Sequence, residues 1–139
     1  MAGVTHVLDA CALLALLESE PGAEKVVESY NKAVSGEITL VIHKINLLEV
    51  YYNLCREYGK DNADKFYNKI KKTPITINHE ITDEIFVEAG RIKMLYKMSL
   101  ADSIALAQTS VSNGMLLTAD HHEFDVVAKK ERISFLWIR

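Results

Sequence analysis

Short apolar runs that alternate with longer amphipathic segments are the feature of this sequence that most restricts its fold. Residues 38–42 and 115–118 are apolar almost throughout, which is typical of strands covered on both faces. After these runs come segments in which apolar residues recur at the spacing of a helix. This alternation predicts an α/β fold, a three-layer sandwich with a central parallel sheet of four to five strands joined by right-handed crossovers. The predicted strands are 5–8, 38–42, 75–77, 115–118 and 133–136, and the predicted helices are 11–17, 23–34, 43–58, 61–72, 82–97, 99–113 and 123–130.

The size and composition of the chain are those of one globular domain, which we expect to span residues 1–139. A chain of 139 residues can bury one sizeable core. Apolar residues make up 49% and charged residues 25%, a balance that argues against disorder. No apolar run approaches the ~18 residues of a membrane helix, and the N-terminus lacks the pattern of a secretion signal. We therefore expect a cytoplasmic protein.

The net charge and the cysteines exclude two further classes of protein. A net charge of −3 is inconsistent with a uniformly basic surface for nucleic acid. Bound nucleic acid must then be held by a local basic patch or through metal ions. Cys11 and Cys55 have the spacing of neither a zinc site nor a redox pair, and we expect buried free thiols.

The helix predicted over residues 43–58 carries an acidic residue on its apolar side. Its apolar side chains recur at helical spacing at Ile45, Leu48, Tyr52 and Cys55, which predicts the buried face. Glu49 shares that face. A carboxylate there is costly unless it is paired or bound to a metal ion.

The helix predicted over residues 99–113 has signals at both ends. Ser99, with Asp102 three residues later, indicates a capping-box-like start. Gly114 follows the last helical residue and is predicted to cap the far end.

Four acidic residues are placed where the predicted topology brings them together. Asp9 and Asp120 follow apolar strands, Asp102 lies in the first turn of its helix, and Glu49 is about 9 Å into its own. In a parallel sheet, strands end and the following helices begin at one edge, where ligands bind. Taken singly, Asp9 and Asp102 are also explained as helix caps and Asp120 as a turn residue. Four acids at one edge favour a cluster.

A cluster of carboxylates predicts a divalent metal ion. Carboxylates held together repel one another and raise their own pKa values, and a cation removes this conflict. Oxygen ligands without a Cys or His set suit Mg²⁺ or Mn²⁺. Such a site activates water for attack on a phosphodiester, and helix N-termini at the same edge favour the phosphate. The predicted chemistry is hydrolysis without a covalent protein intermediate.

With these residues identified, the sequence resembles the PIN-domain ribonucleases, and within them the VapC-type toxins of toxin–antitoxin pairs. The resemblance covers nearly the whole chain and implies a PIN-like sheet with catalytic, metal-binding acids at Asp9, Glu49, Asp102 and Asp120. The motifs that carry it are VLDACALLALL, NLLEV, SLADSIALA and LLTADHHEFD.

The resemblance also implies supporting residues around the acids. Asn46 and Thr118 match polar positions of the family, and we expect them to orient the carboxylates. Asp125 matches an extra acid found in some members, although a solvated helix residue explains it equally well. The family commonly carries Ser or Thr just after the first acid, whereas this chain has Ala10 and Cys11. A thiol is a poor hydrogen-bond partner, so we do not expect this position to give Asp9 the support that a hydroxyl group would.

Adjacent histidines follow the last acid. His121 and His122 lie on a predicted polar turn, so we expect their side chains to be exposed to solvent. They remain candidates for contact with a substrate phosphate.

The resulting prediction is a metal-dependent endoribonuclease, the toxin of a toxin–antitoxin pair. The resemblance implies a homodimer that an antitoxin protein silences, acting away from membranes. One alternative is a catalytically idle PIN-like module that binds RNA or protein. Another is a haloacid-dehalogenase-type phosphatase, whose chemistry requires a second Asp where Cys11 stands. The candidates for RNA binding lie on a basic helical hairpin: Arg56, Lys60, Lys65 and Lys69.

Overall fold

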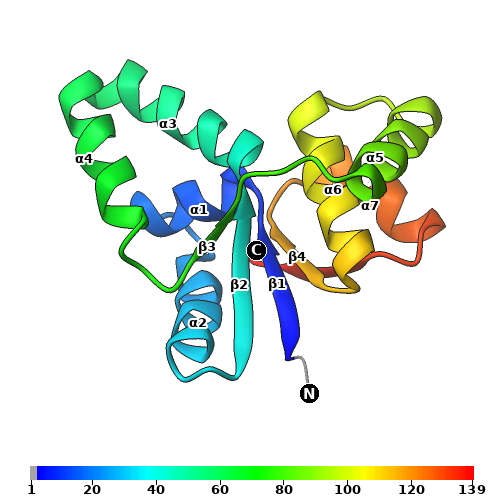
Figure 1. Cartoon of the computed structure of the whole chain (residues 1–139), viewed down its shortest axis with the longest axis horizontal. Helices are drawn as coiled ribbons and strands as arrows, with labels where there is room; N and C mark the ends of the chain where they lie inside the picture. Colours follow the sequence, from blue (N-terminus) through cyan, green and yellow to red (C-terminus); the bar gives the residue numbers. More distant parts are fainter. Residues whose placement is uncertain (1–2) are drawn as a thin grey trace.

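A parallel sheet with the strand order β3-β2-β1-β4-β5 forms the centre of the computed structural model, which describes residues 3–139 (Figure 1). This confirms the predicted α/β sandwich with a parallel sheet. The strands are β1 (Val4–Leu8), β2 (Ile38–His43), β3 (Thr76–Asn78), β4 (Met115–Thr118) and β5 (Ser134–Trp137). The helices are α1 (Ala10–Leu17), α2 (Ala23–Val34), α3 (Lys44–Tyr58), α4 (Lys60–Ile70), α5 (Asp83–Leu95), α6 (Leu100–Ser112) and α7 (His121–Lys130).

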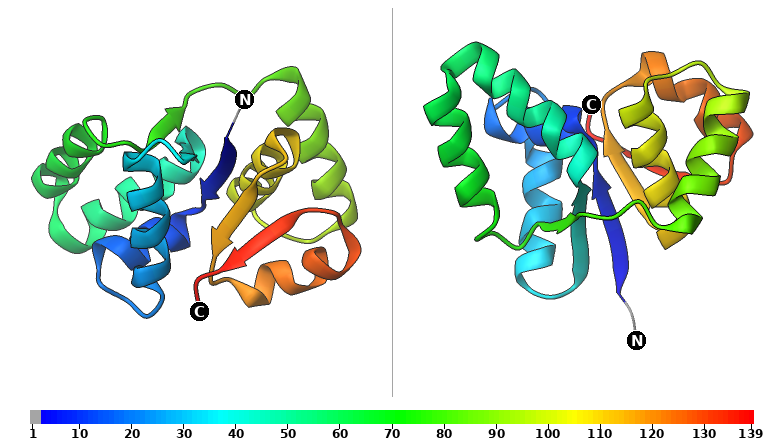
Figure 2. Two further views of the ribbon diagram at one scale, coloured as in Figure 1. Left: turned by 90° about the horizontal axis from the view of Figure 1, so that it is seen from below. Right: turned by 45° about the horizontal axis from the view of Figure 1, so that its top comes forward.

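The helices cover both faces of the sheet and enclose a separate apolar core on each. Helices α1 to α4 pack on one face, where Leu8 and Ile42 are fully buried. Helices α5 to α7 pack on the other, where Val7 and Leu116 are fully buried (Figure 2). Successive strand residues point to opposite faces, so both faces of β1 are apolar. Within the described residues, no helix is long and apolar enough to cross a membrane.

The central position of β1 places Asp9 in the middle of one sheet edge. Leu8 is in register with Ile42 of β2 on one side and with Leu117 of β4 on the other. All strands run parallel, so the residue after Leu8 lies at the carboxyl edge with the starts of the following helices.

The buried face of α3 differs from the predicted one. Leu48 is 55% exposed and Tyr52 41% exposed, so the prediction that they face the core is wrong. Apolar side chains occur at most positions of this helix, so several overlapping periodic patterns fit, and packing against α1, α4 and α6 selects among them. The buried residues are Asn46, Leu47, Val50 and Leu54.

The end of α6 also differs from the prediction. Asn113, not Gly114, adopts the left-handed conformation that caps the helix, with φ 52°. Gly114 serves close packing instead, because a Cβ atom there would lie 2.4 Å from the main-chain oxygen of Thr5 in β1. The backbone of the loop before β4 can approach β1 this closely only without a side chain.

Candidate active site

Asp9 is a buried carboxylate with hydrogen-bond support from two directions. It is 3% exposed and caps α1, where Oδ1 accepts a hydrogen bond of 2.8 Å from the amide of Ala12. Its pKa is raised to about 7, chiefly by burial, which outweighs the opposing effect of hydrogen bonds from Thr118 and Ala12. The charges of Asp102 and Asp120 also contribute to the rise. Asp9 therefore holds its proton close to neutral pH unless a positive charge is nearby.

Asp102 and Asp120 lie at the N-terminal ends of α6 and α7. Asp120 caps α7 by accepting a 3.1 Å hydrogen bond from the amide of Glu123. Ser99 caps α6, so Asp102 is not itself the N-cap. The pKa of Asp102 is raised to about 6, chiefly by burial. A hydrogen bond from Ser99 opposes this rise, and the charges of Asp120, Glu49 and Glu123 contribute to it.

Glu49 joins this set from α3. Its side chain is half-buried, and burial is the main cause that raises its pKa. The negative charge of Asp120 is the second cause of the rise. Asp120 therefore acts electrostatically on Asp9, Asp102 and Glu49 alike. The fold brings the four predicted acids into one electrostatic cluster.

The four carboxylates are of the ligand type that suits a divalent cation, although their side chains are not arranged as a complete coordination site. Within residues 3–139, no three His, Cys, Asp or Glu side chains are grouped closely enough to hold a metal ion. The donors are all carboxylate oxygens, the ligands that Mg²⁺ and Mn²⁺ prefer. A divalent cation would relieve the repulsion that helps to raise the pKa values of Asp9 and Asp102. The buried Oδ1 of Asn46 also has no hydrogen-bond partner, so an acceptor remains free near Glu49.

Asn46 and Thr118 bond to the segments that carry the acids. Asn46 is buried, and its Nδ2 donates a 2.9 Å hydrogen bond to the main-chain oxygen of Ala101. Thr118 is fully buried, and its Oγ1 accepts a 3.0 Å hydrogen bond from the amide of Asp120. The Thr118 hydroxyl also donates to Asp9 and so links the first acid with the last.

The side chain of Asp125 contacts His121 rather than the four acids. Its carboxylate lies 2.8 Å from Nδ1 of His121 and is 54% exposed. Nε2 of His121 donates to the main-chain oxygen of Arg139 at 2.9 Å, and the two acceptors raise the pKa of His121. The acid from α7 that acts on Asp102 is Glu123, which is not among the acids predicted from the sequence. Its place in the first turn of α7 was the available signal.

Cys11 borders an acidic groove between α1 and α3. The groove has a volume of ≈ 360 Å³. Burial raises the pKa of the Cys11 thiol, as does the nearby charge of Asp9. Cys11 and Cys55 are both half-buried free thiols. The lining residues are Ala10, Cys11, Leu14, Glu18, Glu20, Glu49, Asn53 and Glu57.

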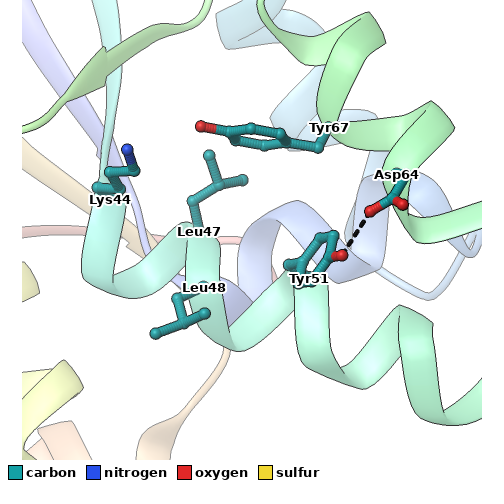
Figure 3. A pocket seen from close by; sticks show the side chains of 6 residues that line it. All are labelled: Lys44, Leu47, Leu48, Tyr51, Asp64 and Tyr67. Carbon is teal, nitrogen blue, oxygen red and sulfur yellow. Dashed lines mark hydrogen bonds between the residues drawn. The ribbon is translucent and has the colours of Figure 1, made fainter. Parts of the chain in front are cut away.

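A second cavity, on the other side of α3, is apolar and contains none of the four acids. It lies between α3 and α4, has a volume of ≈ 340 Å³, and is shown in Figure 3. Its carboxylate, Asp64, already accepts hydrogen bonds from Tyr51 and Lys60. We therefore place the candidate site at the acid cluster. The lining residues are Lys44, Leu47, Leu48, Tyr51, Asp64 and Tyr67.

The predicted RNA-binding residues lie on the hairpin formed by α3 and α4. Arg56, Lys60, Lys65 and Lys69 are all exposed. The ammonium group of Lys60 pairs with Asp64 at 2.6 Å, and the guanidinium of Arg56 lies 5.1 Å from the ring centre of Tyr52. These contacts leave Lys65 and Lys69 as the less constrained cations, and their role in RNA binding stays a prediction.

Comparisons with known proteins agree with this fold. A family model described as the PIN domain matches residues 6–130. No curated protein matches the chain. A toxin-antitoxin complex from Klebsiella pneumoniae is similar in structure, with a TM-score of 0.69 and 16% identity over 96% of this chain and 98% of that chain.

Two further solved structures share the fold at low identity. The DNA-bound VapBC from Salmonella typhimurium has a TM-score of 0.75 and 13% identity, over 98% of this chain and 99% of that chain. VapC20 from Mycobacterium tuberculosis, described as a Sarcin-Ricin loop cleaving toxin, has a TM-score of 0.61 and 15% identity, over 90% of this chain and 95% of that chain. At these identities, the similarity establishes the fold.

Proposed function

Because the chain belongs to the PIN-domain family, we propose that it is an endoribonuclease whose hydrolysis of RNA phosphodiester bonds depends on Mg²⁺ or Mn²⁺. The observation that carries this proposal is the electrostatic coupling of Asp9, Glu49, Asp102 and Asp120 at one sheet edge. The description of the similar VapC20 as a Sarcin-Ricin loop cleaving toxin supports RNA as the substrate.

Each part of the site has a distinct task in this proposal. The carboxylates of the four acids would hold the cation. When bound, Mg²⁺ or Mn²⁺ supplies a Lewis acid that lowers the pKa of water and balances negative charge on the phosphodiester. Thr118 keeps Asp9 and Asp120 in place, since its hydroxyl group bonds to both segments. The N-termini of α6 and α7 contribute partial positive charge for a phosphate.

The proposed biological role is that of a toxin held silent by an antitoxin protein. Similar structures are toxin-antitoxin and VapBC complexes, which supports such a partner. The groove that carries Glu18, Glu20, Glu49 and Glu57 suits a partner segment with Lys or Arg side chains. In this role the chain acts in the cytoplasm as one PIN-like domain.

A homodimer completes this role. The outer side of α5 exposes large apolar side chains, with Phe86 69%, Val87 68% and Met94 78% exposed. A second copy of the chain would cover them, because soluble proteins rarely expose several large apolar side chains on one helix without a partner.

An idle PIN-like module that binds RNA or protein without cutting is the second candidate. Two observations favour it: Cys11 follows the first acid without a hydroxyl group, and the acids in residues 3–139 form no finished metal site. This candidate shares the fold but predicts no hydrolysis.

A cleavage assay separates the two candidates. Purified protein is incubated with single-stranded and structured RNA, with Mg²⁺, Mn²⁺ or a chelator. We expect cleavage only with metal and at least a hundredfold loss in Asp9→Asn and Asp102→Asn, roughly the loss of a charged transition-state contact. Glu37→Gln serves as control, because this exposed carboxylate precedes β2 at the opposite sheet edge. Equal rates in all variants would contradict nuclease activity at this site.

A further inference from the structure

Aromatic side chains of β5 form a stack that reaches the surface beside the candidate active site. Phe135 and Trp137 have ring centres 5.1 Å apart and planes at 7°. The His121 ring stacks on Trp137 with centres 3.9 Å apart and planes at 15°. At the inner end, Phe135 lies 5.9 Å from the fully buried Phe124, centre to centre. The stack therefore runs from the core outward and ends at His121.

The His121 ring is fixed in orientation by hydrogen bonds at both nitrogens. Nδ1 bonds to Asp125 at 2.8 Å, and Nε2 bonds to the main-chain oxygen of Arg139 at 2.9 Å. The side chain is still 48% exposed, although Trp137 covers one face. Within residues 3–139, Trp137 is the one aromatic ring that stacks on His121, so the second ring face has no aromatic partner in the chain. A ligand can thus meet a flat ring face at His121, whereas both N–H groups are already engaged.

His121 lies next to the acid cluster. It directly follows Asp120, so the two Cα atoms are about 3.8 Å apart, and the charge of Asp120 acts on its ring. The groove on the far side of Glu49 carries Glu18, Glu20 and Glu57, which repel a polyanion. The α7 side carries Glu123 and Asp125, of which Asp125 is paired with His121. An RNA strand at the acids therefore meets fewer unpaired carboxylates on the α7 side, where it passes His121.

We propose that His121 is a base-stacking residue: its exposed ring face receives a nucleobase of a single-stranded RNA beside the acid cluster and continues the His121–Trp137–Phe135 stack. This inference rests on the proposed ribonuclease function and names the form of its substrate. Bases of a single strand are free to stack on a side chain, whereas bases of a duplex are already stacked on one another. The stack positions a nucleotide and involves no contact between His121 and the reacting phosphate.

Fluorescence of 2-aminopurine tests stacking independently of cleavage. Short single-stranded RNA oligonucleotides carry 2-aminopurine at one position at a time, and binding to the full chain is followed in chelator, so that no strand is cut. Quenching at one position is expected with the wild type and is absent when the same strand is in a duplex. His121→Ala and His121→Gln should bind about 5- to 150-fold more weakly, the usual effect of losing one base stack. His121→Phe retains an aromatic face and should bind more tightly than His121→Gln.

A distant histidine provides the control. His79→Ala removes an exposed imidazole that follows β3, the edge strand opposite β5, and should leave quenching unchanged. Three results overturn the proposal: no quenching by the wild type, wild-type quenching by His121→Ala, or binding by His121→Gln as tight as by His121→Phe. Thermal unfolding of each variant excludes loss of fold as the cause.

The cleavage assay distinguishes failure of this inference from failure of the proposed function. Stacking without hydrolysis leaves an RNA-binding module and rejects the nuclease. Hydrolysis that is indifferent to His121→Ala in both kcat and KM rejects base stacking and leaves the nuclease.

Discussion

Asn46 of α3 donates a 2.9 Å hydrogen bond from its side-chain amide to the main-chain oxygen of Ala101 in α6. The bond joins the helix that carries Glu49 to the helix that carries Asp102, across 55 positions of sequence. The relative placement of these two acids therefore depends on a side chain that is not itself a predicted ligand.

Removal of this link should weaken metal binding more than folding. For Asn46→Ala we expect a loss of about 1 kcal/mol in unfolding free energy, typical of one hydrogen bond, and a loss of about 10- to 100-fold in Mg²⁺ affinity, typical of residues that orient ligands. Urea unfolding and calorimetric Mg²⁺ titration measure the two effects. Asn62→Ala is the control, because Asn62 makes a similar bond to Tyr58 on the exposed side of α4. Unchanged Mg²⁺ affinity in Asn46→Ala would refute an orienting role.

Neutralising one acid should stabilise the metal-free protein while it removes the response to metal. The negative charges of Asp102 and Asp9 repel each other, and Asp102→Asn removes this repulsion. We expect a higher Tm than wild type in chelator and a smaller rise in Tm on addition of Mn²⁺. The Glu37→Gln control should match wild type in both conditions. A Tm of Asp102→Asn below wild type in chelator would show that repulsion is not what limits stability at this edge.

Replacement of the thiol next to the first acid should raise activity. The half-buried Cys11 thiol is a weak donor close to Asp9. A hydroxyl group in Cys11→Ser could support Asp9, and about 1 kcal/mol of added hydrogen bonding corresponds to about a fivefold gain in kcat/KM. Cys55→Ser, the same change in the other half-buried free thiol, should have no effect on cleavage. A loss of activity in Cys11→Ser alone would mean that the thiol fits this site better than a hydroxyl group.

Two glycine substitutions should change stability in opposite directions. Gly114→Ala forces a Cβ atom toward the main-chain oxygen of Thr5 in the central strand and should cost about 1–3 kcal/mol. Gly90→Ala on α5 meets nothing within 4 Å and should add about 0.5–1 kcal/mol, because alanine favours the helix. Urea unfolding with equal m-values measures both changes. A neutral Gly114→Ala would mean that the loop before β4 can move away from β1.

The ion-pair cluster around Arg91 predicts a pH dependence of stability. Hydrogen bonds from Arg91 lower the pKa values of Glu88 and Glu131 below their ordinary value of 4.5. The folded protein therefore binds these protons less tightly than the unfolded chain. The stability they contribute is complete above pH 4.5 and is lost as the pH falls through the lowered pKa values.

Arg91→Met tests this dependence. It should cost about 1 kcal/mol at pH 7, a value reduced by the partial exposure of Arg91. The difference from wild type should shrink below pH 4.5 in urea unfolding across pH. Lys129→Met, an exposed cation on α7, is the control and should show no such trend. A difference that stays constant down to pH 3 would exclude the two carboxylates as its source.

Local patterns in the sequence determined the strands, the parallel sheet and the location of the acids. A strand such as β1 is apolar on both faces wherever helices cover both, and this is visible without a structure. Asp9 directly follows β1, and Asp120 lies two residues after the end of β4, so the parallel topology alone places them at one edge.

The tertiary structure decided which side chains meet at that edge. The buried face of α3 includes Leu47 rather than Leu48, because packing against other helices chose among several apolar patterns. Glu123 acts on Asp102, while Asp125 bonds to His121. These outcomes depend on contacts between residues far apart in the chain, and their geometry follows from how helices pack on the sheet rather than from any local pattern.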